Sequence, residues 1–356
     1  MPELNEQGTN VELTLEDIRR LPKTDLHCHL DGSVRVSTIL ELAKKRGANL
    51  PADNEKELEK LLAAGAKRNS LKDYLKSFDV TLSVMQDEED IARIAEELCE
   101  DAWADGVWYL EVRFSPILHQ QKGLKLTQVM DAVLAGLKAG ERKTGIRTGV
   151  IVCGIRSIEP AVSLRLAELT VAYKGRGVAG FDLAGQEDHY PAKDHAEAFY
   201  LIRKNNIPCT VHAGEAWGPD SIKQALHDLS AHRIGHGTRL KEDGELLNYV
   251  NDNRIPLECC ISSNVHVGTV ASLDKHPIRF YFDFGLRVTI NTDNRLMSAT
   301  TVSDEYYLAH TALGFTKREL ESIIIMGFKS AFLPYAERKE ILGKVLDELS
   351  IPRIPF

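Results

Sequence analysis

The sequence lacks the features of several large classes of protein. Its six cysteines are scattered over 356 residues without a Cys-x-x-Cys pair, which argues against a disulfide framework or a cysteine metal clamp, so we expect reduced thiols. No apolar run reaches the roughly 18 residues of a membrane span, and the first ten residues do not resemble a signal peptide. Lys and Arg (44) are fewer than Asp and Glu (52). We therefore expect a cytoplasmic protein that binds neither nucleic acid nor membranes.

Short runs rich in β-branched residues alternate with longer amphipathic segments along the chain. The runs predict eight strands: Thr24–Leu30, Val107–Phe114, Arg147–Ile155, Val178–Ala184, Ile207–His212, Arg233–His236, Ile255–Ile261 and Leu286–Thr292. Helical patterns between them include Gln128–Thr144, Pro160–Lys174, Lys193–Asn205, Ser221–Leu229 and Gly244–Asn253. This alternation favours an α/β fold, a (β/α)8 TIM barrel. A doubly wound sheet is the alternative, but no Gly-x-Gly-x-x-Gly motif opens a helix.

The spacing of the strands leaves room for more than a minimal barrel. Residues 33–106 could hold several extra helices before the second strand, and residues 303–349 could hold two or three after the eighth. No linker or internal repeat divides the chain, so we expect one domain over residues 1–356 with a loosely packed N-terminal tail of about residues 1–13. An apolar stripe at helical spacing in the first insertion fits either a helix packed on the barrel or a lid over its mouth: Leu71, Tyr74, Leu75, Phe78, Leu82 and Met85.

A candidate metal site begins in the first predicted strand. His27 and His29 are two residues apart, so their side chains share the face of the strand that points into the barrel. His212, His236 and Asp293 stand at the ends of other predicted strands, where barrel enzymes place their active sites. The first and eighth strands of a closed barrel are neighbours, so His27, His29 and Asp293 can reach one ion, with His212 reaching across the mouth. This donor set suits one zinc-like ion per chain, which would activate water for hydrolysis.

Other charged residues near these strands need separate interpretations. Glu215 follows His212 by three residues and is a candidate proton shuttle, although a first-turn glutamate is also favoured by the helix dipole. Glu111 and Arg113 share a face of the second strand, which predicts a buried structural ion pair between them. Three more histidines have no partner at ligand spacing and are expected to be surface or packing residues: His266, His276 and His310.

Several short motifs follow one another along the chain. They are His-Cys-His-Leu-Asp-Gly (27–32), Phe-Asp-Leu-Ala-Gly (181–185), Val-His-Ala-Gly-Glu (211–215), Arg-Ile-Gly-His-Gly-Thr (233–238), Ser-Ser-Asn (262–264) and Ile-Asn-Thr-Asp (290–293). The ordered set resembles the signature of the adenosine deaminase family, within the metal-dependent amidohydrolase superfamily, from about residue 21 to about residue 338. The resemblance implies zinc held by His27, His29, His212 and Asp293. It also implies hydrolytic deamination of adenosine and 2′-deoxyadenosine to inosine and ammonia, in purine nucleoside salvage.

The resemblance further implies roles for single residues. Glu215 would protonate purine N1, and His236 would orient or deprotonate the attacking water. Asp31 would bind the ribose 5′-hydroxyl, the backbone N–H of Gly185 would bind purine N3, and His29 would contact the substrate as well as the metal. Protonating N1 during attack at C6 avoids a full negative charge on the purine ring, so Glu215 must be protonated when the substrate is bound.

Two further features concern the rest of the substrate pocket. The family places an apolar lid where this chain has Leu71, Tyr74, Leu75 and Phe78. The commonest family pattern has a second aspartate after the metal-binding one, whereas here Asp293 is followed by Asn294. The Asn294 amide would face purine N7 and could donate a hydrogen bond to it at any pH.

Other functions remain open from the sequence. A different 6-aminopurine nucleoside with a bulky 5′ group, of the aminodeoxyfutalosine type, would be distinguished by the pocket around Asp31 and the lid. Phosphotriester or amide hydrolysis on this scaffold often uses two metals bridged by a modified lysine or a glutamate, and residues 184–187 contain no lysine. A non-catalytic nucleoside-binding or growth-factor-like protein would not need a proton shuttle, so Glu215 argues against that class.

Overall fold

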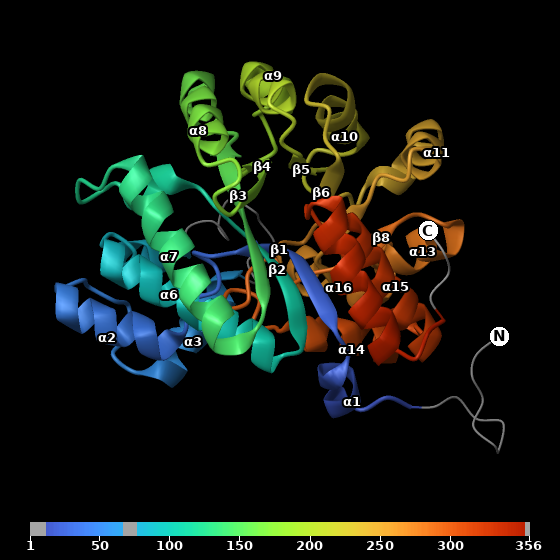
Figure 1. Cartoon of the computed structure of the whole chain (residues 1–356), viewed down its shortest axis with the longest axis horizontal. Helices are drawn as coiled ribbons and strands as arrows, with labels where there is room; N and C mark the ends of the chain where they lie inside the picture. The colour runs from blue at the N-terminus through green and yellow to red at the C-terminus, as the bar shows by residue number, and fades with distance from the viewer. Residues whose placement is uncertain (1–11, 67–76, 353–356) are drawn as a thin grey trace.

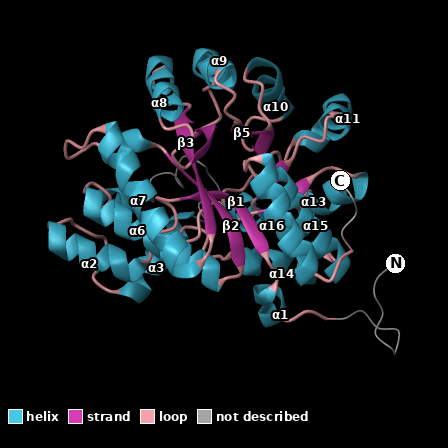
Figure 2. Cartoon of the chain, viewed as in Figure 1, coloured by secondary structure: helices cyan, strands magenta, loops and turns pink. Residues whose placement is uncertain are grey.

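Strands form the centre of the computed structural model and helices surround them (Figure 2). The structure describes residues 12–66 and 77–352, which contain eight strands. The strands are β1 Lys23–His29, β2 Val107–Phe114, β3 Arg147–Ile155, β4 Val178–Ala184, β5 Thr210–Ala213, β6 Arg233–His236, β7 Leu257–Cys259 and β8 Val288–Ile290. They pair in two arcs, in the orders β1-β2-β3-β4 and β5-β6-β7-β8. All of the paired strands run parallel, as strands joined by helical crossovers do.

The two arcs join at both ends, which closes the barrel. A bridge between Phe181 and Cys209 connects β4 to the start of β5, and a bridge between Cys28 and Asp293 connects β1 to the loop after β8. At the second junction, the amide of His29 donates to the carbonyl of Asp293 at 2.7 Å, and the amide of Asp293 donates to the carbonyl of His27 at 2.8 Å. The predicted (β/α)8 barrel is confirmed, and the backbone of three of the predicted metal ligands, His27, His29 and Asp293, forms this junction.

Helices surround the strands on the outside of the barrel (Figure 1). Those between successive strands are α7 Leu126–Thr144, α8 Pro160–Ala172, α9 Ala196–Lys204, α10 Pro219–Lys223, α11 Gly244–Asp252, α12 Ile261–His266 and α13 Ile278–Phe284. Helix α1 (Leu15–Arg20) precedes β1. The predicted extra helices are present: α2 Val36–Arg46, α3 Glu55–Ala66, α5 Phe78–Val84 and α6 Glu88–Ala104 before β2, and α14 Val302–Leu313, α15 Lys317–Ser330 and α16 Tyr335–Glu348 after β8.

Element boundaries differ from the prediction where proline or a neighbouring helix intervenes. Strands β2, β3, β4 and β6 begin and end as predicted, but β5 and β7 begin after Pro208 and Pro256, which have no N–H for the ladder. Strand β8 starts late because the amide of Leu286 donates to the carbonyl of Tyr281 in α13. Pro219 starts α10 earlier than predicted, since proline suits the first helical position. The predicted helix over residues 193–205 divides into a 3-10 turn, Ala192–His195, and α9.

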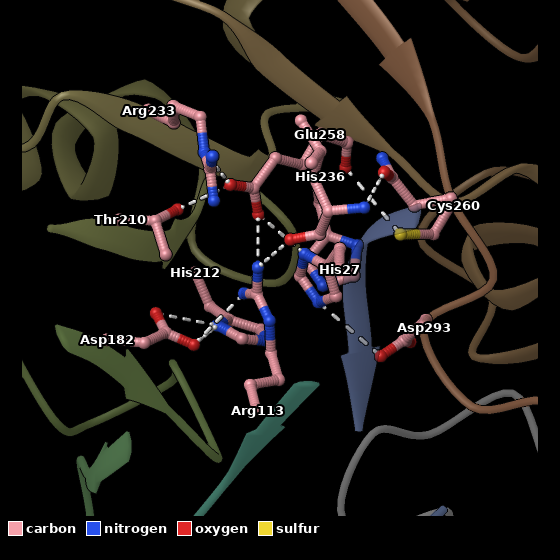
Figure 3. Close-up of polar contacts among 12 residues, drawn as sticks. His27, Arg113, Asp182, Thr210, His212, Arg233, His236, Glu258, Cys260 and Asp293 are labelled. Carbon is pink, nitrogen blue, oxygen red and sulfur yellow. Dashed lines mark hydrogen bonds and ion pairs between the residues drawn. The ribbon is translucent and has the colours of Figure 1, made fainter. Parts of the chain in front are cut away.

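Buried charged side chains fill the barrel beneath its mouth, and we call this set the interior layer: Glu111, Arg113, Asp182, Arg233 and Glu258. Figure 3 shows Arg113, Asp182, Arg233 and Glu258. Arg113 contacts Asp182 at 3.0 Å and Glu258 at 2.8 Å. Arg233 contacts the other oxygen of Glu258 at 2.6 Å and also binds Glu111. The predicted pair between Glu111 and Arg113 is therefore wrong. Both are buried in ion pairs, but inward-pointing side chains of a barrel meet partners from strands across it.

Three smaller expectations can be compared with the structure. All six cysteines are free and buried. Leu13, which we expected in the loose N-terminal tail, is buried, and its amide donates to Nε2 of His310 at 3.1 Å. Among the described residues, none of the helices combines the length and hydrophobicity that a membrane-spanning segment requires.

Candidate active site

The four side chains predicted to bind a metal converge at the carboxyl-terminal mouth of the barrel. His27 and His29 lie on β1, His212 lies on β5, and Asp293 lies just beyond β8. One ligand atom from each of the four lies within 4.8 Å of the others. Nε2 of His29 is 3.2 Å from Nε2 of His212 and 3.4 Å from Oδ1 of Asp293. Three imidazoles and one carboxylate are a donor set that suits a divalent transition-metal ion.

Carboxylates of the interior layer orient two of these imidazoles (Figure 3). Nδ1 of His27 lies 2.8 Å from Glu258, and Nδ1 of His212 lies 3.0 Å from Asp182. A carboxylate that accepts the Nδ1 proton leaves the Nε2 lone pair directed at the cluster. Arg113 binds both carboxylates, so the supports of the two histidines are joined through one guanidinium group.

The cluster leaves polar atoms that a metal ion would satisfy. Nε2 of His27 is buried and makes no hydrogen bond within the described residues. Leaving such an atom without a partner costs about 1–3 kcal/mol. Ser263 donates to Oδ2 of Asp293 at 2.5 Å, while Oδ1 of Asp293 faces the histidines. The residues present therefore fit a bound divalent ion.

Backbone geometry brings the site residues to the mouth. His236 and Asp293 adopt left-handed conformations, with φ of 64° and 61°, which non-glycine residues rarely adopt outside functional sites and turns. A Cβ at position 235 would lie 3.1 Å from Cε1 of His27 and 3.2 Å from Cα of His212. Gly235 thus allows the strands that carry the imidazoles to approach one another closely.

Glu215 and His236 face each other beside the cluster. Oε2 of Glu215 is 3.7 Å from Nε2 of His236. The amide nitrogen of Asn264 lies 3.3 Å from Glu215 and 3.0 Å from Nδ1 of His236. Nε2 of His276 lies 3.2 Å from the amide oxygen of Asn264. His276 is a buried packing residue, which agrees with the expectation, and its ring also contacts the residue that bridges Glu215 and His236.

Burial gives Glu215 and His236 opposite protonation preferences. Burial raises the pKa of Glu215 well above its ordinary value, and the charges of Asp293 and Glu187 raise it further. Burial lowers the pKa of His236 well below its ordinary value. Burial therefore favours the protonated carboxyl group and the neutral imidazole, the states of a proton donor and a proton acceptor.

A cavity of about 260 Å³ opens beside the cluster. It brings together the predicted substrate residues of the described part of the chain: His29, Asp31, Phe78, Gly185 and Asn294, with Glu215 and His236. Oδ1 of Asp31 and Oδ1 of Asn294 are buried without a hydrogen-bond partner, and burial raises the pKa of Asp31 to about 7. Leu71, Tyr74 and Leu75 of the predicted lid lie outside the described residues, whereas Phe78 and Leu82 of the same stripe line the cavity.

Several residues of the site were not singled out from the sequence. Asp182 and Glu258 are single acids within buried apolar strands, a pattern that could have predicted internal partners. Ser263 and Asn264 belong to the Ser-Ser-Asn motif, which was noted without a role. Glu187 binds the turn that carries Glu215, and an acid in a loop gives no pattern that would have revealed this contact.

Comparisons with known proteins agree with this geometry. A family model described as adenosine deaminase matches residues 22–348. A protein of Dictyostelium discoideum described as a probable adenosine deaminase is 46% identical over 91% of this chain, which corresponds to 42% of that longer protein. An adenosine deaminase of Mycobacterium sp. (strain JLS) is 43% identical over 94% of this chain and 96% of its own length.

Solved structures of deaminases also match along most of the chain. The adenine deaminase of Arthrobacter aurescens superposes with a TM-score of 0.87 at 25% identity, over 93% of this chain and 99% of its own. The Arabidopsis N6-mAMP deaminase superposes with a TM-score of 0.84 at 27% identity, over 93% and 99% of the two chains. The family match, the extent of the sequence identity and the shared barrel lead to one conclusion: this chain belongs to the adenosine deaminase family.

Proposed function

We propose that the protein is a zinc-dependent adenosine deaminase, which hydrolyses the C6 amino group of adenosine and 2′-deoxyadenosine to give inosine or 2′-deoxyinosine and ammonia. The observation that carries this proposal is that a His-His-His-Asp cluster and the buried Glu215, whose pKa is raised by burial, border one cavity. The identity of 43% to an adenosine deaminase over nearly the full length of both chains supports the same substrate.

The chemistry divides between the bound ion and the side chains around it. Zinc held by His27, His29, His212 and Asp293 would supply Lewis-acid activation of the attacking water. Glu215 donates a proton to purine N1 as C6 becomes tetrahedral, so that no full negative charge develops on the ring. The C6 nitrogen leaves as ammonia, and the proton of the new C6 hydroxyl passes to the Glu215 carboxylate as the C6 carbonyl forms, which restores the acid.

His236 and Asn264 complete the movement and placement of protons. The neutral His236 accepts a proton from the water as its oxygen bonds to C6, and it can return that proton to the leaving amine. The side-chain amide of Asn264 contacts both Glu215 and His236, which holds the donor and the acceptor at a fixed separation. Each group therefore meets the substrate in the protonation state that its step requires.

The remaining cavity residues would orient the nucleoside. The backbone N–H of Gly185 binds purine N3, the amide of Asn294 donates to N7, and Asp31 binds the 5′-hydroxyl of the ribose. A polar group at each place supports these contacts, since the cavity is lined by all three residues. Phe78 and Leu82, which line the cavity, supply an apolar surface against the sugar and the base.

The charge of the cavity favours a nucleoside over a nucleotide. Asp31 and Asp79 both line it, and no Lys or Arg of the described residues does. A 5′-phosphate placed near these carboxylates would be repelled, because like charges in a site of low dielectric interact strongly. This distinguishes the proposed substrate from that of the Arabidopsis relative, which is named for a nucleotide.

A panel of 6-aminopurine compounds tests the proposal. Adenosine, 2′-deoxyadenosine, adenine, AMP, N6-methyl-AMP and a 5′-extended nucleoside of the aminodeoxyfutalosine type are compared by ultraviolet absorbance loss and ammonia release. We expect adenosine and 2′-deoxyadenosine to have the highest kcat/KM. A higher kcat/KM for adenine, a nucleotide or the 5′-extended nucleoside would overturn the assignment of substrate.

A further inference from the structure

The turn that carries Glu215 is bound by a single buried carboxylate from another loop. Glu187 lies three residues beyond the end of β4, and only 4% of its surface is exposed. One of its oxygens accepts the amide of Gly214 at 2.6 Å. The other accepts the amides of Glu215 at 3.0 Å, Trp217 at 2.8 Å and Ala216.

These bonds take up four successive backbone donors that no ladder or helix satisfies. Residues 214–217 follow the end of β5 and precede α10, and the chain bends at each of them. Successive N–H groups that converge on one anion form a strong, directional cradle, because each bond is charge-assisted. Without the carboxylate, buried N–H groups would lack partners, and the turn would have to rearrange to reach water.

The carbonyl side of the same turn is held separately. The carbonyl of Gly214 accepts from the hydroxyl of Thr238 at 2.9 Å and from the amide of Arg239 at 3.0 Å. The donors of these two bonds, Thr238 and Arg239, follow β6, and His236 is the last residue of that strand. The conformation of residues 214–217 is therefore set from both sides, and on the amide side Glu187 makes all four contacts.

We propose that Glu187 is a positioning residue for deamination, which binds the amides of residues 214–217 and thereby holds the Glu215 carboxyl at the distance from the substrate that proton transfer requires. The proposal rests on the proposed function, in which Glu215 is the proton donor. Glu187 itself does not touch the substrate. It acts on catalysis through the backbone of Glu215, whose side chain contacts the substrate.

The first test is the steady-state kinetics of Glu187→Gln and Glu187→Asp with adenosine, in protein that carries its metal. The amide group of Gln places an N–H₂ against N–H donors, so we expect kcat to fall about 10- to 100-fold, the effect of misplacing a catalytic group by about 1 Å. KM and metal content should stay within about twofold, because only an interaction of the transition state is weakened. Glu187→Asp keeps the charge and should recover part of kcat.

A double-mutant cycle with Glu215→Gln shows whether Glu187 acts through Glu215. If it does, Glu187→Gln should slow the Glu215→Gln variant by no more than about twofold, since the donor is already lost. Hydrogen exchange of the amides of residues 214–217 should become about tenfold faster in Glu187→Gln than in wild type, and more so than exchange elsewhere. This readout needs no activity.

Asp105→Asn is the matched control. Asp105 is a buried carboxylate that accepts the amide of Ser303 at 3.2 Å, in the loop between α6 and β2. Its replacement should lower Tm without changing kcat per metal-loaded chain. Wild-type kcat in Glu187→Gln, or a loss that adds fully to that of Glu215→Gln, would overturn the positioning role. Absence of adenosine turnover in the wild type would instead overturn the proposed function.

Discussion

In the interior layer every carboxylate lies against an arginine, whereas at the mouth of the barrel Asp31, Glu215 and Asp293 have no Lys or Arg partner within the described residues. Burial acts on both groups in the same direction. The charges of Arg113 and Arg233 nevertheless hold the pKa of Glu258 well below its ordinary value, while the pKa of Glu215 is raised well above it.

This difference separates structural carboxylates from chemical ones. Glu258 and Asp182 of the interior layer are held by Arg113 and in turn orient His27 and His212, so both carboxylates have partners inside the protein. The mouth retains buried atoms without partners, among them Nε2 of His27 and Oδ1 of Asp31. A buried polar atom without a hydrogen-bond partner calls for an explanation, and at the mouth a bound ligand provides one.

The largest expected effect is at the mouth, in Glu215→Gln. An amide cannot donate the N1 proton as an acid does, so we expect kcat to fall on the order of 10³-fold while the metal is retained. In the wild type, turnover should fall as pH rises through the raised pKa of Glu215. Steady-state kinetics across pH, with metal analysis of both proteins, measures these effects.

The same substitution should not weaken the fold. A carboxyl group with a raised folded-state pKa destabilises the protein progressively as pH rises from its ordinary value of 4.5 toward the raised one. Glutamine does not ionise and so avoids this destabilisation. The difference in Tm between Glu215→Gln and wild type should therefore increase in favour of the variant as pH rises from 4.5 toward the raised pKa. A variant that keeps most of its activity, or loses Tm as well, would return Glu215 to a structural role.

The interior layer should respond in the opposite way. Arg113→Met leaves Asp182 and Glu258 buried with one partner fewer, and breaking such a pair costs about 3–5 kcal/mol. Urea unfolding of the metal-loaded protein should show this loss, together with weaker metal binding, because both carboxylates orient metal ligands. A loss below about 1 kcal/mol would mean that the layer is not a structural unit.

The sequence allowed the metal cluster to be predicted because its geometry follows from local rules. A His-x-His pair on one strand shares a face, and strand ends meet at one mouth, so His27, His29, His212 and Asp293 could be placed together. The arginine partners could not be assigned, because which inward side chains meet depends on the stagger of the closed barrel. Glu187 and His276 lie in loops, whose path no periodicity encodes. The shortened β5 and β7 could have been predicted from Pro208 and Pro256.

A smaller effect concerns the charge at the sugar end of the cavity. We expect kcat/KM for AMP to be about 100-fold or more below kcat/KM for adenosine. Asp31→Asn should reduce this difference, because it lowers kcat/KM for adenosine and raises kcat/KM for AMP. Competition assays with both substrates measure the ratio directly. Similar kcat/KM values for adenosine and AMP in the wild type would instead indicate a phosphate-binding site formed by residues that do not line this cavity.

The smallest expected effect is a change in pH dependence at Asn294. Asn294→Asp should remain active but show a fall in kcat/KM as pH rises through the pKa of the new carboxyl group, because only the protonated acid can donate to N7. The wild type should not show this fall in kcat/KM, because the Asn294 amide does not ionise. Asn294→Leu serves as the control, and wild-type behaviour of that variant would remove the N7 contact.

Reconstitution with metal tests the central claim most directly. The protein is stripped with a chelator, its metal content is measured, and adenosine deamination is followed while zinc is added back. We predict no turnover in the stripped protein and full recovery at about one zinc ion per chain, with recovery abolished in His27→Ala. Full-rate deamination by metal-free protein would contradict the assignment of His27, His29, His212 and Asp293 as a catalytic metal site.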